Sequence, residues 1–432
     1  MDKIREIALN ALYKIEKNGA YSNIVLDETI KKNKNNITTR DVGLISELVY
    51  GVTTWKLSLD EIIKQHSKIK LKKISPWIIN VLRMGIYQIV FLDKIPKSAA
   101  VNESVNLAKK YGNKGAVGFT NAILRQVDES DYKKMFSIEN PAEKISKTNS
   151  MPLWIVEKLI AQKGIEQAEE ICKNSNLRPS LTIRINNLKT DNEQFISILK
   201  EQKIEYEKTD NDNFIVLKKQ KNLENMQLFK EGYFTVQDLS AGLSAEVLAP
   251  QEGENVLDCC SAPGGKTTYL AELMNNKGYI EAWDIHEHRV KLVENNSNRL
   301  GINIIKTKVK DATVYDKNYN EKFDKILLDV PCLGIGVIKR KPDIKWQRKP
   351  EDIKEITKLQ MQILNTCSKY LKKGGELVYS TCSILNEENE NIIEQFLKDN
   401  KNFKFYDNNK KYININTDKN YDGFFISKLK KY

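Results

Sequence analysis

The chain has 432 residues and a formal net charge of +12, with 41% hydrophobic and 29% charged residues. This length is more than one hydrophobic core usually serves, so we expect two or three domains of an ordinary soluble protein. The excess of basic residues favours a polyanionic partner, nucleic acid above all; a lysine-rich composition that only maintains solubility is the alternative.

The sequence carries no evident targeting or metal-binding signal. No apolar run approaches the ~20 residues that span a membrane, and the N-terminus lacks the apolar centre of a signal peptide. The six cysteines show no Cys-x-x-Cys spacing and the three histidines no ligand spacing, which argues against a disulfide framework and a metal site. We therefore expect a cytoplasmic protein without a membrane or metal partner, in which cysteines can act as reactive thiols.

The first third of the chain is predicted to form an all-α domain. Apolar residues recur at helical spacing over residues 4–15 and 41–63. Ser75-Pro76 is a favourable helix start, because serine caps a helix and proline suits its first position. Further helices are expected over residues 98–110 and 116–126, and no catalytic cluster is evident here.

Residues 1–130 also resemble a known RNA-binding domain. The resemblance is to the helical domain of the antiterminator NusB, and it implies that this part of the chain binds RNA. A helical bundle that only packs against its neighbours is the alternative. The stretches that carry the resemblance are Val81-Leu82-Arg83-Met84-Gly85-Ile86-Tyr87-Gln88-Ile89, Ile95-Pro96-Lys97-Ser98-Ala99-Ala100-Val101-Asn102-Glu103 and Gly118-Phe119-Thr120-Asn121-Ala122-Ile123-Leu124-Arg125.

Residues 131–150 lack a clear period and are predicted to be a linker. Residues 151–235 then show strand-like alternation at 180–185 and 214–217, with a helical pattern between them. This pattern favours a small α+β module. Arg184, in the first of these strands, either contacts phosphates or is an ordinary solvated charge, and the second interpretation is favoured.

Residues 236–432 alternate between strand and helix patterns, which indicates a parallel, doubly wound α/β sheet. The strand candidates are residues 255–258, 279–284, 303–309, 325–328 and 375–380. Each ends in, or is followed by, a chemically useful side chain: in order Asp258, Asp284, Asp311, Asp329 with Cys332, and Cys382. Because ligands of such sheets bind beyond the carboxyl ends of the strands, these side chains predict one site.

The turn Cys260-Ser261-Ala262-Pro263-Gly264-Gly265-Lys266 separates the first of these strands from a helix. Its glycines let a ligand approach the backbone, and the helix N-terminus presents free N–H groups. The turn matches neither a Walker A loop nor G-x-G-x-x-G, which argues against a pyrophosphate. A nucleoside-type ligand remains, of which S-adenosyl-L-methionine is the commonest, and Asp284 is well placed for its ribose. A purely structural turn is the alternative.

Two cysteines follow buried strands, in Asp329-Val330-Pro331-Cys332 and in Ser380-Thr381-Cys382, so both should face one cleft. Addition of a thiolate to carbon 6 of a pyrimidine makes carbon 5 able to accept a methyl group from a sulfonium. An acid such as Asp329 can supply the hydrogen bond that this addition needs at ring nitrogen 3. A second group must help release the thiol, and the residues alone do not decide which cysteine attacks.

Pro331-Cys332 together with Thr381-Cys382 resembles the paired motif of the RNA cytosine-5 methyltransferases. The resemblance implies that Cys382 is the nucleophile and that Cys332 assists release. It also implies a set of cofactor-binding residues, which are Cys260, Ser261, Ala262, Pro263, Gly264, Gly265, Lys266, Asp284 at the ribose, Asp311 on the adenine side and Asp329 in the active site.

The resemblance extends through residues 336–346 and, with the NusB-like part, covers most of the chain. It is to the small-subunit ribosomal RNA cytosine-5 methyltransferases that carry a NusB-like extension. It implies an all-α NusB-like domain (1–130), an RRM-like α+β module (151–235) after the linker, and a Rossmann-like S-adenosyl-L-methionine-dependent methyltransferase domain (236–432). Small-subunit ribosomal RNA is then the expected substrate, and no protein partner is indicated.

Two other functions stay open at this point. One is the same chemistry on transfer RNA, and the other is a NusB-like RNA-binding factor whose methyltransferase half is an inactive scaffold. A basic cluster around Trp346 suggests that cations hold phosphates while the indole stacks on a base, with a solvated basic loop as the alternative. The cluster consists of Lys339, Arg340, Lys341, Lys345, Arg348 and Lys349.

Overall fold

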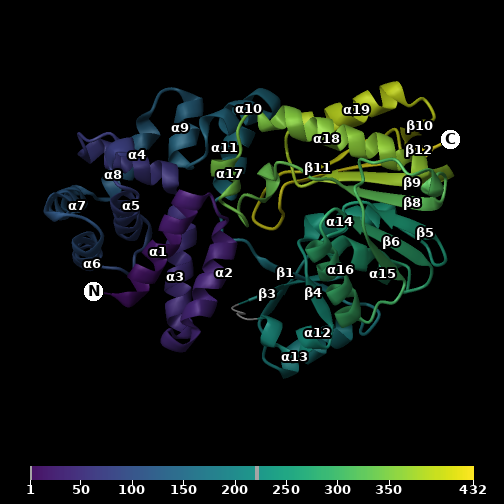
Figure 1. Ribbon diagram of the computed structural model, residues 1–432, viewed down its shortest axis with the longest axis horizontal. Helices are drawn as coiled ribbons and strands as arrows, with labels where there is room; N and C mark the ends of the chain where they lie inside the picture. Colours follow the sequence, from purple (N-terminus) through teal and green to yellow (C-terminus); the bar gives the residue numbers. More distant parts are fainter. Residues whose placement is uncertain (1, 219–222) are drawn as a thin grey trace. The chain divides into compact units, whose positions relative to one another are not determined.

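The computed structural model describes residues 2–218 and 223–432, which form two compact units (Figure 1). Each unit is built from two segments that are separate in the sequence. The units are Met1–Leu177 with Ile338–Arg348, and Arg178–Val337 with Lys349–Tyr432. Across the described ranges, no helix has both the length and the apolar character needed to cross a membrane.

The first unit contains helices and no strand among its described residues, as the periodicity predicts. Its central helix is α5 (Pro76–Phe91), which is buried along residues 78–88. The hydroxyl oxygen of Ser75 accepts the backbone N–H of Ile78 at 3.3 Å, so the helix starts where its cap predicts. The other helices are α1 Lys3–Asn18, α2 Ser22–Asn33, α3 Thr39–Thr54, α4 Lys56–His66, α6 Lys97–Tyr111, α7 Lys114–Gln126, α8 Glu129–Lys133, α9 Pro141–Thr148, α10 Leu153–Lys163, α11 Ile165–Asn174 and α17 Ile344–Gln347.

Two stretches of this unit differ from the expectation. Residues 41–63 lie in two helices, α3 and α4, and the break falls at Trp55, whose ring stacks on Phe91 with centroids 4.6 Å apart. Residues 131–150, expected as a linker, contain the end of α8 and all of α9. Their polar side chains supply caps, as Asn140 does for α9, so low hydrophobicity did not prevent helix formation.

Residues 338–348 pack into the first unit although they lie far along the chain. The backbone N–H of Ser22 donates to Oδ2 of Asp343 at 3.0 Å, and Nε1 of Trp346 donates to the carbonyl of Thr53 at 2.6 Å. The indole is thereby held against the first unit. The structure therefore does not support the interpretation that Trp346 stacks on a base of RNA.

The second unit contains a small antiparallel sheet in the order β2-β3-β1-β4. Helices α12 and α13 contribute Phe195 and Leu228 to its core, where they meet Ile183 and Ile215. The outer strands β2 and β4 were not predicted, because three residues are too few to show a period. The elements are β1 Leu181–Ile185, β2 Tyr206–Lys208, β3 Phe214–Leu217, β4 Phe234–Val236, α12 Asn192–Glu201 and α13 Gln227–Lys230.

The larger sheet has the order β10-β12-β9-β8-β5-β6-β7, with β11 paired to β12. Strands β5 to β9 are parallel, whereas β10, β11 and β12 are antiparallel, so the sheet is mixed and not wholly parallel as predicted. The chain runs from β5 to β6 on one side and returns to β8 on the other, so the carboxyl end of β5 borders a topological switch point. The strands are β5 Asn255–Asp258, β6 Tyr279–Asp284, β7 Ile305–Val309, β8 Phe323–Asp329, β9 Leu371–Thr381, β10 Phe403–Phe405, β11 Ile413–Ile415 and β12 Phe424–Lys431.

Helices cover both faces of this sheet. On one face α15 packs Leu270 into a core with Val256 of β5. On the other face α18 and α19 pack Leu364 and Phe396 into a core with Leu257, the next residue of β5. Successive side chains of β5 point to opposite faces of the sheet, so neighbouring residues of this strand belong to different cores. The helices are α14 Leu239–Leu248, α15 Gly265–Leu273, α16 Glu287–Leu300, α18 Asp352–Cys367 and α19 Glu390–Asp399.

One lysine of the first unit is completely buried. Nζ of Lys345 in α17 donates to Oδ1 of Asn176 at 3.0 Å. Burial lowers the pKa of Lys345 from its ordinary 10.5 to about 7, although Cys172 acts in the opposite direction. The unfolded chain therefore binds more protons than the folded chain between about pH 7 and 10.5, and stability rises with pH across this window.

Replacement of this lysine by an apolar residue should stabilise the protein at neutral pH. We expect Lys345→Met to raise the unfolding temperature at pH 7, by about 2–4 °C for each kcal/mol recovered, and to lose this advantage towards pH 10.5. Calorimetric unfolding at both ends of the window tests this, with exposed Lys341→Met as the control. An equal rise in unfolding temperature at both pH values would contradict the lowered pKa of Lys345.

Candidate active site

The polar residues predicted at strand ends lie along one edge of the larger sheet. β5 ends at Asp258, β6 at Asp284 and β8 at Asp329. Cys382 directly follows β9, and Asp311 comes two residues after β7. Because these five strands are parallel neighbours, their carboxyl ends meet at the same edge.

The turn 260–266 joins β5 to α15 and is held by its neighbours. The hydroxyl of Ser261 donates to the carbonyl of Trp283 at 2.9 Å, and Nη2 of Arg289 donates to the carbonyl of Ala262 at 3.0 Å. Both partners belong to the β6–α16 region, so the turn is tied to the neighbouring strand and helix.

Two glycines give this turn its shape. Gly264 has φ of +103°, which favours glycine, and a Cβ there would lie 3.0 Å from Cα of Val293. At Gly265 the nearest atoms to an added Cβ belong to Gln237 at 3.7 Å, so the backbone there is not tightly covered. This glycine-lined cradle fits a nucleoside-type cofactor that lies against the backbone.

The smaller sheet supports the same turn through Arg184, which is fully buried in β1. Its Nη1 donates to the carbonyl of Gly265 at 2.7 Å, and its Nε and Nη2 donate to the carboxylate of Glu272 at 2.9 and 2.7 Å. Burial raises the pKa of Glu272, and Arg184 opposes this. The interpretation of Arg184 as a solvated charge or phosphate contact is therefore wrong, because its donors are used inside the fold.

Asp258 is buried just before the turn, and Cys260, the first residue of the turn, is partly buried. Oδ2 of Asp258 accepts the hydroxyl of Thr267 at 2.7 Å, and burial raises the pKa of Asp258 to about 7. Burial also raises the pKa of the Cys260 thiol well above its ordinary value, so this thiol stays protonated. The hydrogen bond from Thr267 ties Asp258 to the start of α15, so this carboxyl helps to shape the turn.

The two acids expected at the cofactor organise their own turns. Oδ1 of Asp284 accepts the backbone N–H of His286 at 3.0 Å, and Oδ1 of Asp311 accepts that of Thr313 at 2.8 Å. Ile285, directly after Asp284, is 55% exposed, which is unusual for isoleucine. It offers an apolar surface beside the cradle.

Asp329 forms an ion pair with a lysine of the glycine-rich turn. Nζ of Lys266 lies 2.6 Å from Oδ2, and the hydroxyl of Ser380 donates to Oδ1 at 2.9 Å. Burial acts to lower the pKa of Lys266, but Asp329 and Cys382 outweigh it and the pKa is raised. Lys266 thus remains an ammonium ion whose charge acts on both Asp329 and Cys382.

The sulfur atoms of Cys332 and Cys382 lie 2.6 Å apart, so the two turns do bring the thiols together. The hydrogen bond with Cys382 raises the pKa of Cys332 well above its ordinary value, and burial adds to this. The raised pKa favours the protonated form of Cys332, and either sulfur can be the donor in this contact. All six cysteines are free, and no group of His, Cys, Asp or Glu in the described ranges is arranged to hold a metal ion.

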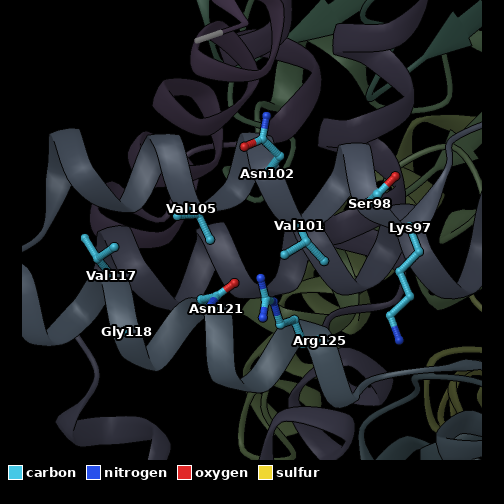
Figure 2. Close-up of a pocket in the computed structure, with 9 residues that line it drawn as sticks. All are labelled: Lys97, Ser98, Val101, Asn102, Val105, Val117, Gly118, Asn121 and Arg125. Carbon is cyan, nitrogen blue, oxygen red and sulfur yellow. The ribbon is translucent and has the colours of Figure 1, made fainter.

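A groove of about 660 Å³ lies in the first unit between α6 and α7 (Figure 2). The exposed cations Lys97 and Arg125 line it together with the amides of Asn102 and Asn121. Val101, Val105 and Val117 supply an apolar floor. These donors suit a polyanionic chain, which accepts hydrogen bonds from cations and amides.

Four side chains near this edge were not assigned to the site from the sequence. Ile285 directly follows Asp284 and Ser380 lies two residues before Cys382, so the signal for them was their position at a strand end. Arg184 and Glu388 had no local signal, because their partners lie far away in the chain.

The two glycines of the turn should differ in their response to an added methyl group. We expect Gly264→Ala to destabilise the protein by about 1–3 kcal/mol, because alanine is strained at this φ and its Cβ meets the α16 backbone. Gly265→Ala, whose added Cβ would meet Gln237 only at an ordinary contact distance of 3.7 Å, should change stability by less than about 1 kcal/mol. Urea unfolding of both variants measures the difference, and equal losses would refute this account.

Comparisons with known families match three consecutive parts of the chain. Residues 245–430 match the family described as 16S rRNA methyltransferase RsmB/F, residues 2–129 match the NusB family, and residues 151–224 match the RsmF/B-like ferredoxin-like domain. The fold thus combines a NusB helical domain, a ferredoxin-like module and a Rossmann-like methyltransferase domain.

Individual relatives agree with these matches. The chain is 39% identical to the probable ribosomal RNA small subunit methyltransferase B of Bacillus subtilis, over 93% of this chain and 89% of that protein. The crystal structure titled PH0851 has a TM-score of 0.80 at 27% identity and 98% coverage of both chains. A methyltransferase homolog from Pyrococcus horikoshii has a TM-score of 0.61 at 28% identity, covering 68% of this chain and 100% of that one. Because the chain is 39% identical to the Bacillus subtilis protein over nearly its whole length, it belongs to the family of ribosomal RNA small subunit methyltransferase B.

Proposed function

We propose that this protein transfers a methyl group from S-adenosyl-L-methionine to carbon 5 of a cytosine in small-subunit ribosomal RNA. The transfer would proceed through a covalent bond between Cys382 and carbon 6 of the base. The observation that carries the proposal is the 2.6 Å approach of the Cys332 and Cys382 sulfur atoms beside the pair of Lys266 and Asp329. The relatives named as ribosomal RNA small subunit methyltransferases support the substrate class.

The glycine-lined turn is our candidate for the cofactor site. We assign binding to the turn 260–266, to Asp284 at the ribose hydroxyls and to Asp311 on the adenine side. Ile285 adds an apolar contact for the adenine ring. When bound, S-adenosyl-L-methionine supplies an electrophilic methyl group.

Cys382 attacks carbon 6 as a thiolate. The positive charge of the Lys266 ammonium group interacts electrostatically with Cys382. Asp329, held in place by Lys266 and Ser380, donates as an acid the proton or hydrogen bond that ring nitrogen 3 needs as negative charge moves into the base. The same lysine thus serves the nucleophile and the acid.

Cys332 assists release after the methyl group has been accepted. The hydrogen bond with Cys382, together with burial, keeps the pKa of Cys332 high before the attack. Once the Cys382 sulfur is bonded to carbon 6 it bears no negative charge, so Cys332 can lose its proton to solvent. It then takes the proton from carbon 5, and the electrons of that C–H bond expel Cys382 as a thiolate.

The target cytosine must leave its stack to reach these thiols. This costs least in single-stranded or loop RNA. We assign the groove between α6 and α7 to the phosphate backbone of the same RNA, because Lys97 and Arg125 offer positive charge there. Phosphate contacts of this kind position the RNA without specifying its sequence.

The two cysteines should give opposite phenotypes. We expect Cys382→Ala to abolish transfer of labelled methyl groups to small-subunit ribosomal RNA, because the proposal assigns the bond to carbon 6 to this thiol and only the later release step to Cys332. Cys332→Ala should accumulate a protein–RNA adduct that survives a denaturing gel. Cys172→Ala changes a buried thiol of the first unit that has no part in the proposed site, so it is the control and should methylate without an adduct.

Other outcomes of this assay favour the other functions. Reversed phenotypes would exchange the roles of the two cysteines. Labelling of transfer RNA in preference to ribosomal RNA would change the substrate. A wild-type protein that binds RNA but shows no calorimetric binding of S-adenosyl-L-methionine would be an inactive scaffold.

Loss of charge in the groove should weaken RNA binding independently of sequence. We expect Lys97→Glu with Arg125→Glu to lower the slope of log affinity against log salt by about 0.7 for each lost single-strand phosphate contact. Filter binding across a salt series measures the slope. Lys68→Glu, exposed in the turn after α4, is the control. An unchanged slope in the double variant would exclude the groove from the RNA path.

A further inference from the structure

A buried carboxylate lies between the turns that carry the two cysteines. Glu388, at the end of the short helix Asn386–Glu388, has no exposed surface. Its Oε2 accepts the backbone N–H of Leu333 at 2.9 Å, and its Oε1 accepts the hydroxyl of Ser383. Leu333 directly follows Cys332, and Ser383 directly follows Cys382, so one side chain holds both turns.

Two neighbours of Glu388 hold the preceding residues of the same turns. Nε2 of Gln360 donates to Glu388 at 3.0 Å and to the carbonyl of Pro331, the residue before Cys332, at 2.9 Å. Oγ1 of Thr381, the residue before Cys382, donates to Oδ1 of Asn389 at 2.6 Å. Each cysteine is therefore held on both sides by groups that connect to one buried cluster.

The buried cluster around Glu388 connects the two turns beyond the end of the hydrogen-bonded pairing between β8 and β9. Between β8 and its neighbour β9, the pairing runs to Asp329 opposite Ser380, and the N–H of Val330 donates to the carbonyl of Ser380 at 3.1 Å. Beyond that point the turns are joined by the bond from the N–H of Gly336 to the carbonyl of Cys382 at 3.0 Å. Glu388 adds a link directly beside each cysteine.

A carboxylate suits this position because it accepts several hydrogen bonds at once. The Leu333 N–H, the Gln360 amide and the Ser383 hydroxyl are all donors, and bonds to an ionised acceptor are stronger than neutral ones. These donors offset part of the cost of burying the side chain. Movement of either turn away from the other would break at least one of these hydrogen bonds.

We infer that Glu388 is a positioning residue that sets the distance and orientation between the thiols of Cys332 and Cys382. It acts through the Leu333 N–H and the Ser383 hydroxyl and touches neither the base nor the cofactor. Its effect on catalysis rests on the proposed function, in which Cys332 must reach the carbon 5 proton while Cys382 is bonded to carbon 6. Its effect on the distance between the two thiols is independent of the proposed function.

The first experiment measures the thiols without any catalysis. Oxidised glutathione converts two adjacent thiols into a disulfide and is itself reduced to two molecules of glutathione. We expect the Cys332–Cys382 disulfide to form about 10- to 100-fold more slowly in Glu388→Ala than in the wild type, because misplacement of reacting groups by about 1 Å carries a penalty of that size. Mass spectrometry of alkylated peptides reports the rate.

Two further variants keep this test interpretable. Glu388→Gln retains the shape and one acceptor oxygen, so it should fold and show an intermediate rate even where Glu388→Ala does not fold. Glu394→Gln removes an exposed carboxylate from α19 and should oxidise like the wild type. Wild-type oxidation rates in folded Glu388→Gln and Glu388→Ala would overturn the inference.

The second experiment measures release. In Glu388→Gln we expect a lower kcat and more covalent protein–RNA adduct at steady state, with unchanged KM for the cofactor and RNA. A loss of kcat without adduct would count against a role in release. If the wild type shows no methyl transfer, the proposed function fails, while the oxidation rates still decide whether Glu388 positions the thiols.

Discussion

The pairing of β8 with β9 is the constraint on which the rest of the site depends. In this parallel pair Asp329 lies opposite Ser380, and the turn that follows each strand carries a cysteine. The register brings together two sulfur atoms that are 50 residues apart in the chain. A slip of one residue would turn every side chain of the slipped strand to the other face of the sheet. The contact of Asp329 with Lys266 and the contact between the thiols would then be lost together.

Beyond the strand ends, buried polar side chains hold the turns. Arg184 and Glu272 support the glycine-rich turn from the smaller sheet, and Glu388 links the two cysteine turns. Removal of such charges from water costs several kcal/mol unless donors and acceptors meet in good geometry. These turns therefore have few alternative arrangements, which suits the proposed site, where a thiol, a methyl donor and a base must be held in fixed positions relative to one another.

Predictions that relied on near neighbours in the sequence agree well with the structure. β5 and β6 have the predicted limits, and α5 starts at its predicted cap. Interpretations that relied on the charge of a segment did not hold. Trp346 lies among basic residues, yet its indole N–H is bonded to Thr53, 293 residues earlier. Arg184 is likewise bonded to a distant residue, because its carboxylate partner Glu272 lies 88 residues away in the chain.

The sequence by itself determined the order of helices and strands and the kind of side chain at each strand end. Periodicity, caps and glycine turns act between residues a few positions apart, so they can be recognised in the linear chain. Only the tertiary structure decided which of these side chains meet: Lys266 with Asp329, Cys332 with Cys382, and Glu388 with both cysteine turns. Those contacts depend on strand register and on packing between distant segments, and no local pattern encodes either.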